Sequence, residues 1–254
     1  MIRLTGVEKS FGRNHVLRGV DLEIQEGETL TIMGGSGTGK SVLIKHIVGL
    51  LHPDKGQVFV DNQEITHMTD EELFQVQKRF GYLFQGAALF DSLTVEENIA
   101  FGIRNLRPDL AKHWRDVVPE KLALVGLKPE VGKLKPAELS GGMKKRVGLA
   151  RAIAYEPDYI LYDEPTTGLD PIMSDVINEL ILGLQKKLNV TSVVVTHDMN
   201  SAYKISNRMA MLYQGKVVLV GTPKEIRSTT NPLVKQFVTG SSEGPIQMQV
   251  RAVE

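Results

Sequence analysis

A glycine-rich segment early in the chain has the residue types and the spacing of a phosphate-binding loop. Residues 34–41 read GGSGTGKS, which fits the pattern GxxxxGK[ST]. Glycines let the backbone turn with its amides facing inward, where they bind phosphate oxygens. The helix expected to follow would direct its free N-terminal amides at the same anion. Lys40 would then contact the β- and γ-phosphates, and the Ser41 hydroxyl would bind Mg²⁺.

The alternative is a glycine-rich turn that matches the pattern by accident. It is disfavoured because the segment lies between an expected strand and an expected helix, which is the context that phosphate binding requires. We therefore predict a loop that binds the phosphates of ATP. Its residues are Gly34, Gly35, Ser36, Gly37, Thr38, Gly39, Lys40 and Ser41.

Two adjacent acids follow a short apolar strand later in the sequence. Asp163 and Glu164 come directly after residues 159–162, and ligands of open α/β sheets bind at the carboxyl ends of the strands. Successive strand residues point to opposite sides, so the two acids must differ in role. We expect Asp163 to hold Mg²⁺ through water and Glu164 to orient and deprotonate an attacking water. A simple acidic turn is the alternative, which the nearby phosphate loop makes less favourable.

A second anion site is expected about twenty residues before these acids, at residues 139–143, which read LSGGM. Ser140 is a natural helix N-cap, and Gly141 and Gly142 would expose amides at the start of the helix that follows. One nucleotide already fills the first loop, so the expected occupant is the γ-phosphate of a nucleotide held by a second chain. An ordinary capped helix is the alternative reading. The basic residues 144–146 are expected to form a solvated helix face.

The remaining patterns describe the scaffold that must position these motifs. Apolar alternation predicts strands at the N-terminus and at 28–33, and turn residues mark a strand at 57–60. Strands and helices then alternate, which is typical of a parallel sheet with helices on both faces, interrupted by a mainly helical stretch over 86–154. From Gly240 onward the sequence is expected to be extended or mobile. The later strands are predicted at 159–162, 191–196 and 208–213, and the helices at 42–51, 95–103, 114–125, 141–154 and 171–188.

Composition excludes several classes of protein. Thirty basic and thirty acidic residues cancel, so the basic field of a nucleic-acid-binding protein is absent and no nucleic-acid partner is expected. The absence of cysteine excludes disulfides and thiolate metal sites. The N-terminus lacks the apolar stretch of a signal peptide, and no segment approaches the roughly 18 uninterrupted apolar residues of a membrane span. At a membrane, other chains would have to do the spanning.

The order of these motifs resembles the ATP-binding cassette (ABC) family, whose signature LSGGQ is matched except at Met143. The resemblance covers nearly the whole chain. It implies an α/β fold of the P-loop NTPase type, with a RecA-like core around a parallel sheet, an N-terminal antiparallel β-subdomain and an α-helical insert. The ATPase domain would span 1–240, with the core and β-subdomain at about 1–85 and 155–240 and the helical subdomain at about 86–154. Residues 241–254 would form a C-terminal tail.

The resemblance also gives roles to five further residues. Gln85 corresponds to a glutamine that senses Mg²⁺ and water, Asp170 to an aspartate that reaches across a dimer, and His197 to a switch histidine near the γ-phosphate. Phe11 stands where the family stacks an aromatic ring on adenine, and Val16 where it packs against the same nucleotide. Each has a plainer alternative: a structural histidine, a polar turn residue, or a ring packed in a hairpin.

Features around the signature narrow the kind of transporter. Met143, the segment 85–90 and the tail residues 236–245 resemble the ATPases of MCE/Mla-type phospholipid transport systems, also called toluene-tolerance ATPases. The resemblance implies a homodimer, an integral-membrane permease, an MCE-domain protein and a place on the cytoplasmic face of the inner membrane. Val42 departs from the usual threonine after the loop, but Ser41 retains the magnesium hydroxyl. Alternatives left open are another cargo such as amino acids, or a cassette ATPase of DNA repair or translation.

Overall fold

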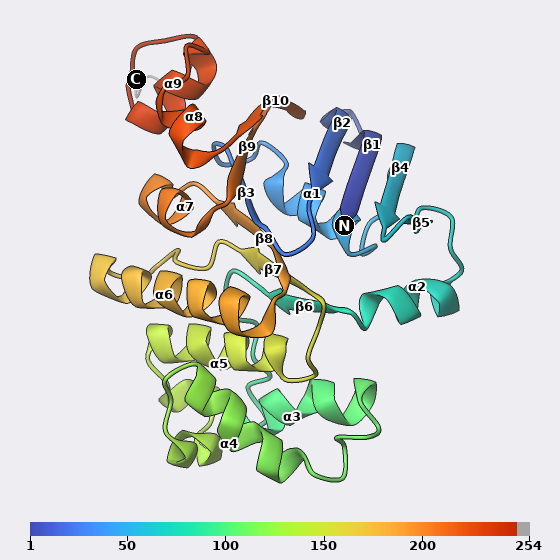
Figure 1. Ribbon diagram of the computed structural model, residues 1–254, viewed down its shortest axis with the longest axis vertical. Helices are drawn as coiled ribbons and strands as arrows, with labels where there is room; N and C mark the ends of the chain where they lie inside the picture. The colour runs from blue at the N-terminus through green and yellow to red at the C-terminus, as the bar shows by residue number, and fades with distance from the viewer. Residues whose placement is uncertain (248–254) are drawn as a thin grey trace.

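Two sheets form the centre of the protein in the computed structural model, which describes residues 1–247. The first sheet has four antiparallel strands in the order β2-β1-β4-β5, and the long pair β1 and β2 alternates buried and exposed side chains as the sequence predicts. Figure 1 shows this sheet on one side of helix α1. The strands are β1 (Ile2–Phe11), β2 (Asn14–Ile24), β4 (Lys55–Val60) and β5 (Gln63–Glu64).

The second sheet has six strands in the order β10-β9-β3-β8-β7-β6, and all of its neighbouring pairs are parallel except β10 with β9. The central strands β3, β7 and β8 are buried on both faces, as parallel strands covered by helices must be. This arrangement confirms the predicted α/β class. The strands are β3 (Thr29–Met33), β6 (Phe80–Leu83), β7 (Tyr159–Asp163), β8 (Thr191–Thr196), β9 (Arg208–Tyr213) and β10 (Lys216–Gly221).

Four of the parallel strands end at one edge of this sheet, and each passes directly into a predicted motif. Because parallel strands carry their carboxyl ends to the same edge, segments far apart in sequence meet there. The strand β3 leads to the phosphate loop, β7 to the acid pair, β8 to the switch histidine and β6 to the glutamine. The fold therefore gathers the candidate chemistry at a single place.

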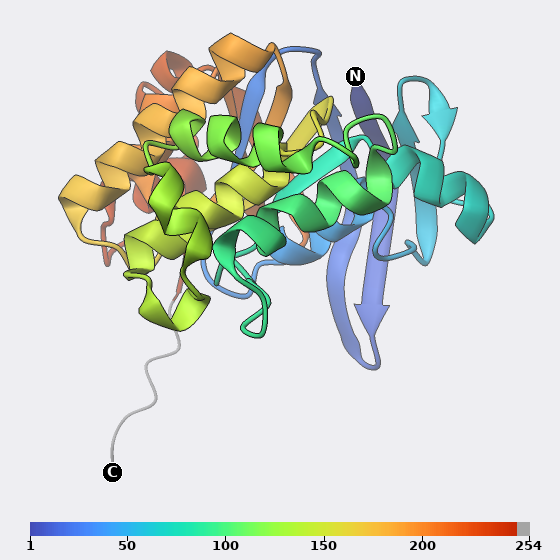
Figure 2. The same ribbon diagram turned by 90° about the horizontal axis from the view of Figure 1, so that it is seen from below.

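Helices cover the sheet in three apolar clusters. One cluster joins the two sheets around α1, a second packs α3, α5 and α6 on the opposite face, and a third lies under the C-terminal helices. Helices α3, α4 and α5 come between β6 and β7 in the chain; Figure 1 shows them as a group below the six-stranded sheet, and in Figure 2, seen from below, they lie in front of it. The helices are α1 (Lys40–Ile47), α2 (Asp70–Gln77), α3 (Val95–Leu106), α4 (Trp114–Leu124), α5 (Gly141–Ile153), α6 (Pro171–Leu188), α7 (Met199–Ile205), α8 (Pro223–Arg227) and α9 (Pro232–Thr239), with 3-10 turns η1 (Pro129–Lys133) and η2 (Pro136–Glu138).

Two expectations from the sequence need correction. Helix α1 begins at Lys40 and ends at Ile47, whereas the sequence predicted 42–51. It stops early because Gly49 adopts a left-handed φ of 69°. The segment after Gly240 is also more ordered than expected as far as it is described: Gln236 donates to the Ser241 and Ile246 carbonyls and accepts from the Ile246 amide. Residues 248–254 of the predicted tail lie outside the described part of the chain.

Candidate active site

The phosphate loop connects β3 to α1 in a conformation that depends on glycine. Gly34 has a φ of 157°, and a Cβ there would collide with the backbone carbonyl of Leu212. Gly39 has a φ of 100°, a left-handed value that favours glycine. It is also the N-cap of α1 and supplies no side chain to the first helical amides. Those amides therefore stay available to an anion at the positive end of the helix dipole.

The Lys40 ammonium lies inside the loop that precedes it. Its Nζ donates to the carbonyl oxygens of Gly34 at 2.8 Å and Gly35 at 2.9 Å, and lies 3.8 Å from the Glu164 carboxylate. Only 7% of the residue is exposed. Burial lowers the pKa of Lys40, while Glu164 and Asp163 oppose that effect by favouring the charged form. Lys40 thus occupies the centre of the phosphate loop at residues 34–41, which we call the phosphate cradle, and it lies close to both acids.

The Ser41 hydroxyl and the Asp163 carboxylate meet although 122 positions separate them in the sequence. Ser41 Oγ donates to Asp163 Oδ1 at 3.1 Å, and the Tyr82 hydroxyl of β6 donates to Oδ2 at 3.4 Å. Burial raises the pKa of Asp163, and the two hydroxyl donors act in the opposite direction. A hydroxyl and one carboxylate suit Mg²⁺, which prefers oxygen ligands and retains several waters and phosphate oxygens.

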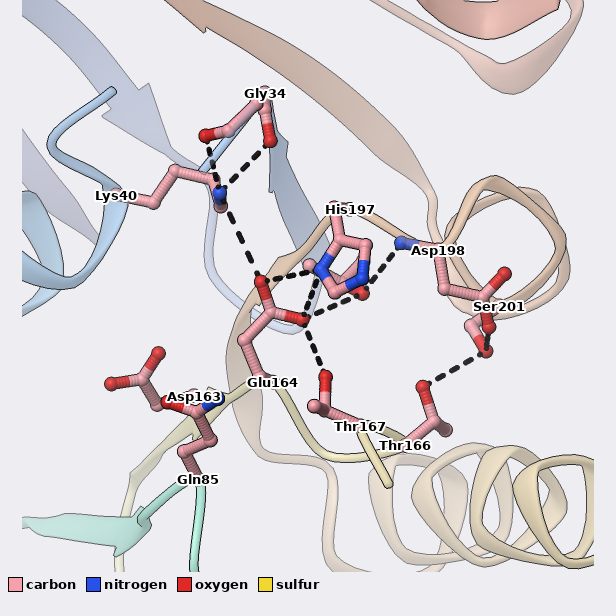
Figure 3. Close-up of polar contacts among 12 residues, drawn as sticks. Gly34, Lys40, Gln85, Asp163, Glu164, Thr166, Thr167, His197, Asp198 and Ser201 are labelled. Carbon is pink, nitrogen blue, oxygen red and sulfur yellow. Dashed lines mark hydrogen bonds and ion pairs between the residues drawn. The ribbon is translucent and has the colours of Figure 1, made fainter. Parts of the chain in front are cut away.

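Glu164 is held in an uncommon backbone conformation at the end of β7. Its φ is +50°, a left-handed value that costs energy for a residue with a side chain. The carboxylate accepts from His197 Nδ1 at 3.0 Å, from Thr167 Oγ1 at 3.0 Å and from Thr196 Oγ1 at 3.4 Å (Figure 3). With Lys40 on its other side, this carboxylate is fixed in place at the centre of the site. Such strain held by surrounding contacts is frequent at catalytic residues.

His197 follows β8, and its ring is half exposed while Glu164 is nearly buried. A polar chain fixes the turn after it. The Asp198 amide donates to Thr196 Oγ1 at 3.0 Å, and Ser201 Oγ donates to Asp198 at 2.5 Å (Figure 3). Asn178 of α6 donates to the same Ser201 hydroxyl at 2.8 Å. The position of His197 is therefore tied to α6 as well as to its own strand.

The turn after β6 is held through its backbone, and here a prediction is wrong. Lys145 was expected on a solvated helix face, but it is 5% exposed and its ammonium donates to the carbonyls of Gln85 and Glu164. Arg151 of the same helix donates to the Ala87 carbonyl at 2.6 Å. The Gln85 side chain itself is exposed.

The signature residues begin α5 and lie outside the phosphate loop. Ser140 is the N-cap: its Oγ accepts from the Met143 amide at 3.3 Å. Within residues 1–247, no hydrogen bond joins the Ser140 side chain to the loop at 34–41. Gly142 is buried against Met173 of α6, whose side chain occupies the space that a Cβ would need. Asp170 caps α6 by accepting from two backbone amides at 3.0 Å.

The two residues expected near the adenine differ in their surroundings. Val16 lies against the phosphate loop, since a Cβ added at Gly39 would approach Val16 Cγ1 to 3.0 Å. Phe11 ends β1 at the tip of the first hairpin and is 48% exposed, with Lys9 Nζ 5.8 Å from the ring centre. An exposed ring at a hairpin tip is available for stacking, and its role stays a prediction.

Sequence reasoning missed Tyr82, Thr167, Thr196 and Lys145. A signal existed for the lysine. Residues 142, 145, 149 and 152 share one face of a helix by their spacing of three or four, and the other three are apolar or small. No comparable signal marked the threonines. The contact of Thr196 with Glu164 depends on how β7 and β8 meet, and that of Thr167, three residues after Glu164, depends on the shape of the turn between them.

Known proteins resemble this chain over most of its length. A family model described as "ABC transporter" matches residues 17–167. The chain is 40% identical over 247 residues to a "Probable ribonucleotide transport ATP-binding protein mkl" of Mycobacterium tuberculosis, covering 97% of this chain and 68% of that protein. It is 40% identical over 252 residues to the "Intermembrane phospholipid transport system ATP-binding protein MlaF" of Haemophilus influenzae, covering 99% and 95%.

A solved structure is similar over most of the fold. It is a dimeric ATP-binding cassette in a post-hydrolysis state bound to ADP and phosphate. The TM-score is 0.81 with 34% sequence identity, covering 88% of this chain and 99% of that one. The fold and the site together define a P-loop ATPase. The chain belongs to the ABC transporter family, as the resemblance of its motifs predicted, and ATP is its nucleotide.

Proposed function

We propose that this chain is the ATP-hydrolysing subunit of a phospholipid transporter and that two copies enclose two molecules of MgATP. The observation that carries the proposal is the meeting of Lys40, Asp163, Glu164 and His197 at one sheet edge, around a loop with free helix amides. These groups bind a terminal phosphate, neutralise its charge and hold a base beside it.

The chemistry follows from the positions of these side chains. Loop amides and Lys40 hold the β- and γ-phosphates. Glu164 orients the attacking water and takes its proton, and His197 contacts the γ-phosphate from the same side. Mg²⁺, held by Ser41 and Asp163 with Gln85 nearby, would supply positive charge to the phosphate oxygens. The three donors around Glu164 keep its carboxylate aimed at one place.

A second chain is needed because the signature lies outside the cradle of its own chain. Ser140, Gly141 and Gly142 present a capped helix N-terminus in which Ser140 and Gly141 are exposed. We infer that this surface contacts the γ-phosphate bound to the partner, with Asp170 reaching across the same interface. The solved cassette that resembles this chain is described as dimeric, which supports the arrangement.

The membrane partner is expected to dock beside the turn after β6. A cavity of about 260 Å³ there is lined by Phe84, Phe90 and Phe101, which are 38%, 44% and 47% exposed. Within residues 1–247, no helix combines the length and the hydropathy that a membrane span requires. We propose that a permease docks near residues 87–98, that the chain lies on the cytoplasmic face of the inner membrane, and that an MCE-domain protein completes the complex.

The test of the ATPase assignment is Glu164→Gln, which preserves shape and removes the base. We expect turnover to fall by about 100- to 10,000-fold while ATP produces a stable dimer in light scattering. Glu179→Gln is the matched control, since this exposed glutamate of α6 pairs with Lys204 of α7, away from the phosphate loop. Normal hydrolysis by the Glu164 variant would refute the assignment.

The cargo is tested separately by purifying the complex from native membranes. An MCE-domain companion and bound phospholipid are the expected result, and the name of the Haemophilus relative supports the phospholipid. Recovery of a periplasmic amino-acid receptor, or of a ribonucleotide as the mycobacterial relative's name suggests, would overturn the phospholipid proposal and leave the ATPase assignment intact.

A further inference from the structure

Lys145 is a buried cation that the proposed reaction does not use directly. It lies on α5, four residues after Gly141, and its ammonium donates to two backbone carbonyls. One carbonyl belongs to Gln85, in the turn after β6. The other belongs to Glu164, at 3.0 Å, in the turn after β7. A single side chain therefore bridges the two loops that carry the proposed base and the proposed magnesium sensor.

Both of these turns have backbone conformations that need external support. Glu164 has a φ of +50°, and Ala87 and Ala88 have φ values of +60° and +46°. Non-glycine residues keep such conformations only where surrounding contacts determine them. Arg151, six residues further along α5, donates to the carbonyls of Ala87 and Ala88 at 2.6 and 2.7 Å. The same helix thus supplies the donors for both turns.

The cost of burying this lysine indicates that its contacts matter. Burial lowers its pKa, and the charges of Glu164 and Asp163 favour the ammonium form. A buried ammonium is tolerated when its protons are hydrogen-bonded, and removing it would leave two carbonyls without that donor. The helix that carries Lys145 begins with the signature residues. Movement of the signature relative to the core would therefore alter the hydrogen bonds of Lys145 to both carbonyls.

We propose that Lys145 is a positioning residue, which aligns the backbone of Glu164 with that of Gln85 and ties both to the signature helix. It acts through these residues, since its ammonium donates to their backbone carbonyls. The inference rests on the ATPase function proposed above. Its consequence is kinetic: nucleotide binding should survive loss of the ammonium, while the chemical step should slow.

The test is Lys145→Met, studied in the assembled transporter. The methionine fills a similar volume without donors. We expect kcat to fall about 10- to 100-fold, the effect of a small misplacement of catalytic groups, and KM for ATP to change less than about threefold. Lys145→Gln, which has two N–H donors on a shorter side chain, should retain an intermediate kcat. Lys144→Met, the same charge change at the neighbouring position, is the matched control and should stay within about twofold of the unaltered protein.

A double variant separates positioning from general damage. Added to Glu164→Gln, Lys145→Met should slow single-turnover hydrolysis no further and should leave the ATP-dependent dimer intact, since residues acting as one unit are not additive. Additive losses, loss of the dimer, or an unchanged kcat in Lys145→Met would each overturn the proposal.

The variants of Lys145 and of Glu164 test the positioning role and the ATPase assignment separately. If Lys145→Met does not fold, as judged by thermal unfolding, Lys145→Gln carries the test, and an unchanged kcat there overturns the proposal. Normal hydrolysis by Glu164→Gln would instead refute the assignment of the base. If Glu164→Gln does not hydrolyse ATP while Lys145→Met is fully active, only the positioning role is refuted.

Discussion

Replacing Lys40 by methionine removes the ammonium from the phosphate cradle while keeping most of the side-chain length. Truncating one member of a buried charged contact costs about 2–5 kcal/mol. The ammonium donates to the Gly34 and Gly35 carbonyls at 2.8 and 2.9 Å. These bonds are given up in part when phosphate binds, so the lower part of that range applies. About 3 kcal/mol corresponds to an increase in Kd for ATP of roughly 100-fold.

Titration calorimetry with ATP and magnesium measures this change directly. Lys45→Met is the matched control, because Lys45 lies on the same helix and is exposed. The control should change Kd by less than about threefold, the range of an exposed charge. A Kd for Lys40→Met within threefold of the unaltered protein would refute the reasoning, and so would equal losses in the two variants.

Two further predictions concern stacking and stability. Phe11→Ala should weaken ATP binding about tenfold, since base–aromatic stacking contributes about 1–3 kcal/mol, but should leave the affinity for tripolyphosphate unchanged in the same titration; equal losses for both ligands would contradict stacking. Burial alone would raise the pKa of Asp61, but hydrogen bonds from the amino terminus, Tyr159 and Arg79 outweigh it and lower that pKa to about 2. The full shift from 3.8 corresponds to about 2 kcal/mol, reduced to about 1 kcal/mol because the side chain is 38% exposed. This stability is present above pH 4 and is lost as the pH falls from about 4 to 2. Asp61→Asn should therefore lower the free energy of unfolding at pH 7 and flatten its pH dependence between about pH 4 and 2. Urea titrations measure this free energy, and Asp91→Asn, at an exposed position, is the control.

The parts of this fold that local sequence patterns specify were the parts that could be predicted. Strands β7, β8 and β9 are short apolar runs bounded by turn residues, and the phosphate loop is defined by eight consecutive positions. Helix α2 escaped prediction although Thr69 and Glu72 form a capping box at its start, because its eight residues carry too few apolar positions to show a helical period. The end of α1 was misplaced because the apolar residues continue to Leu51, whereas Gly49 ends the helix.

The site was predictable in its residues and less so in its contacts. Asp163 and Glu164 could be assigned different roles from strand alternation alone, and the structure gives them different partners, Ser41 and His197. The spacing of residues 142, 145, 149 and 152 carried a signal for the burial of Lys145, but its two carbonyl partners could not be derived in this way, because they depend on how α5 packs against two turns that are distant in sequence. Composition suggested a solvated lysine, and tertiary packing determined otherwise.

The central claim is that each ATP is enclosed by Lys40 of one chain and Ser140 of the other, and mixed dimers test it most directly. All chains carry Glu164→Gln to trap nucleotide, and Ser140→Asp retains a good helix cap while repelling phosphate. One complex pairs a Lys40→Met chain with a Ser140→Asp chain; the other places both changes in one chain and neither in its partner. Counting trapped ATP per complex, the account predicts one nucleotide in the first and none in the second. One nucleotide in the second and none in the first would mean that each chain binds ATP alone, and would contradict the account.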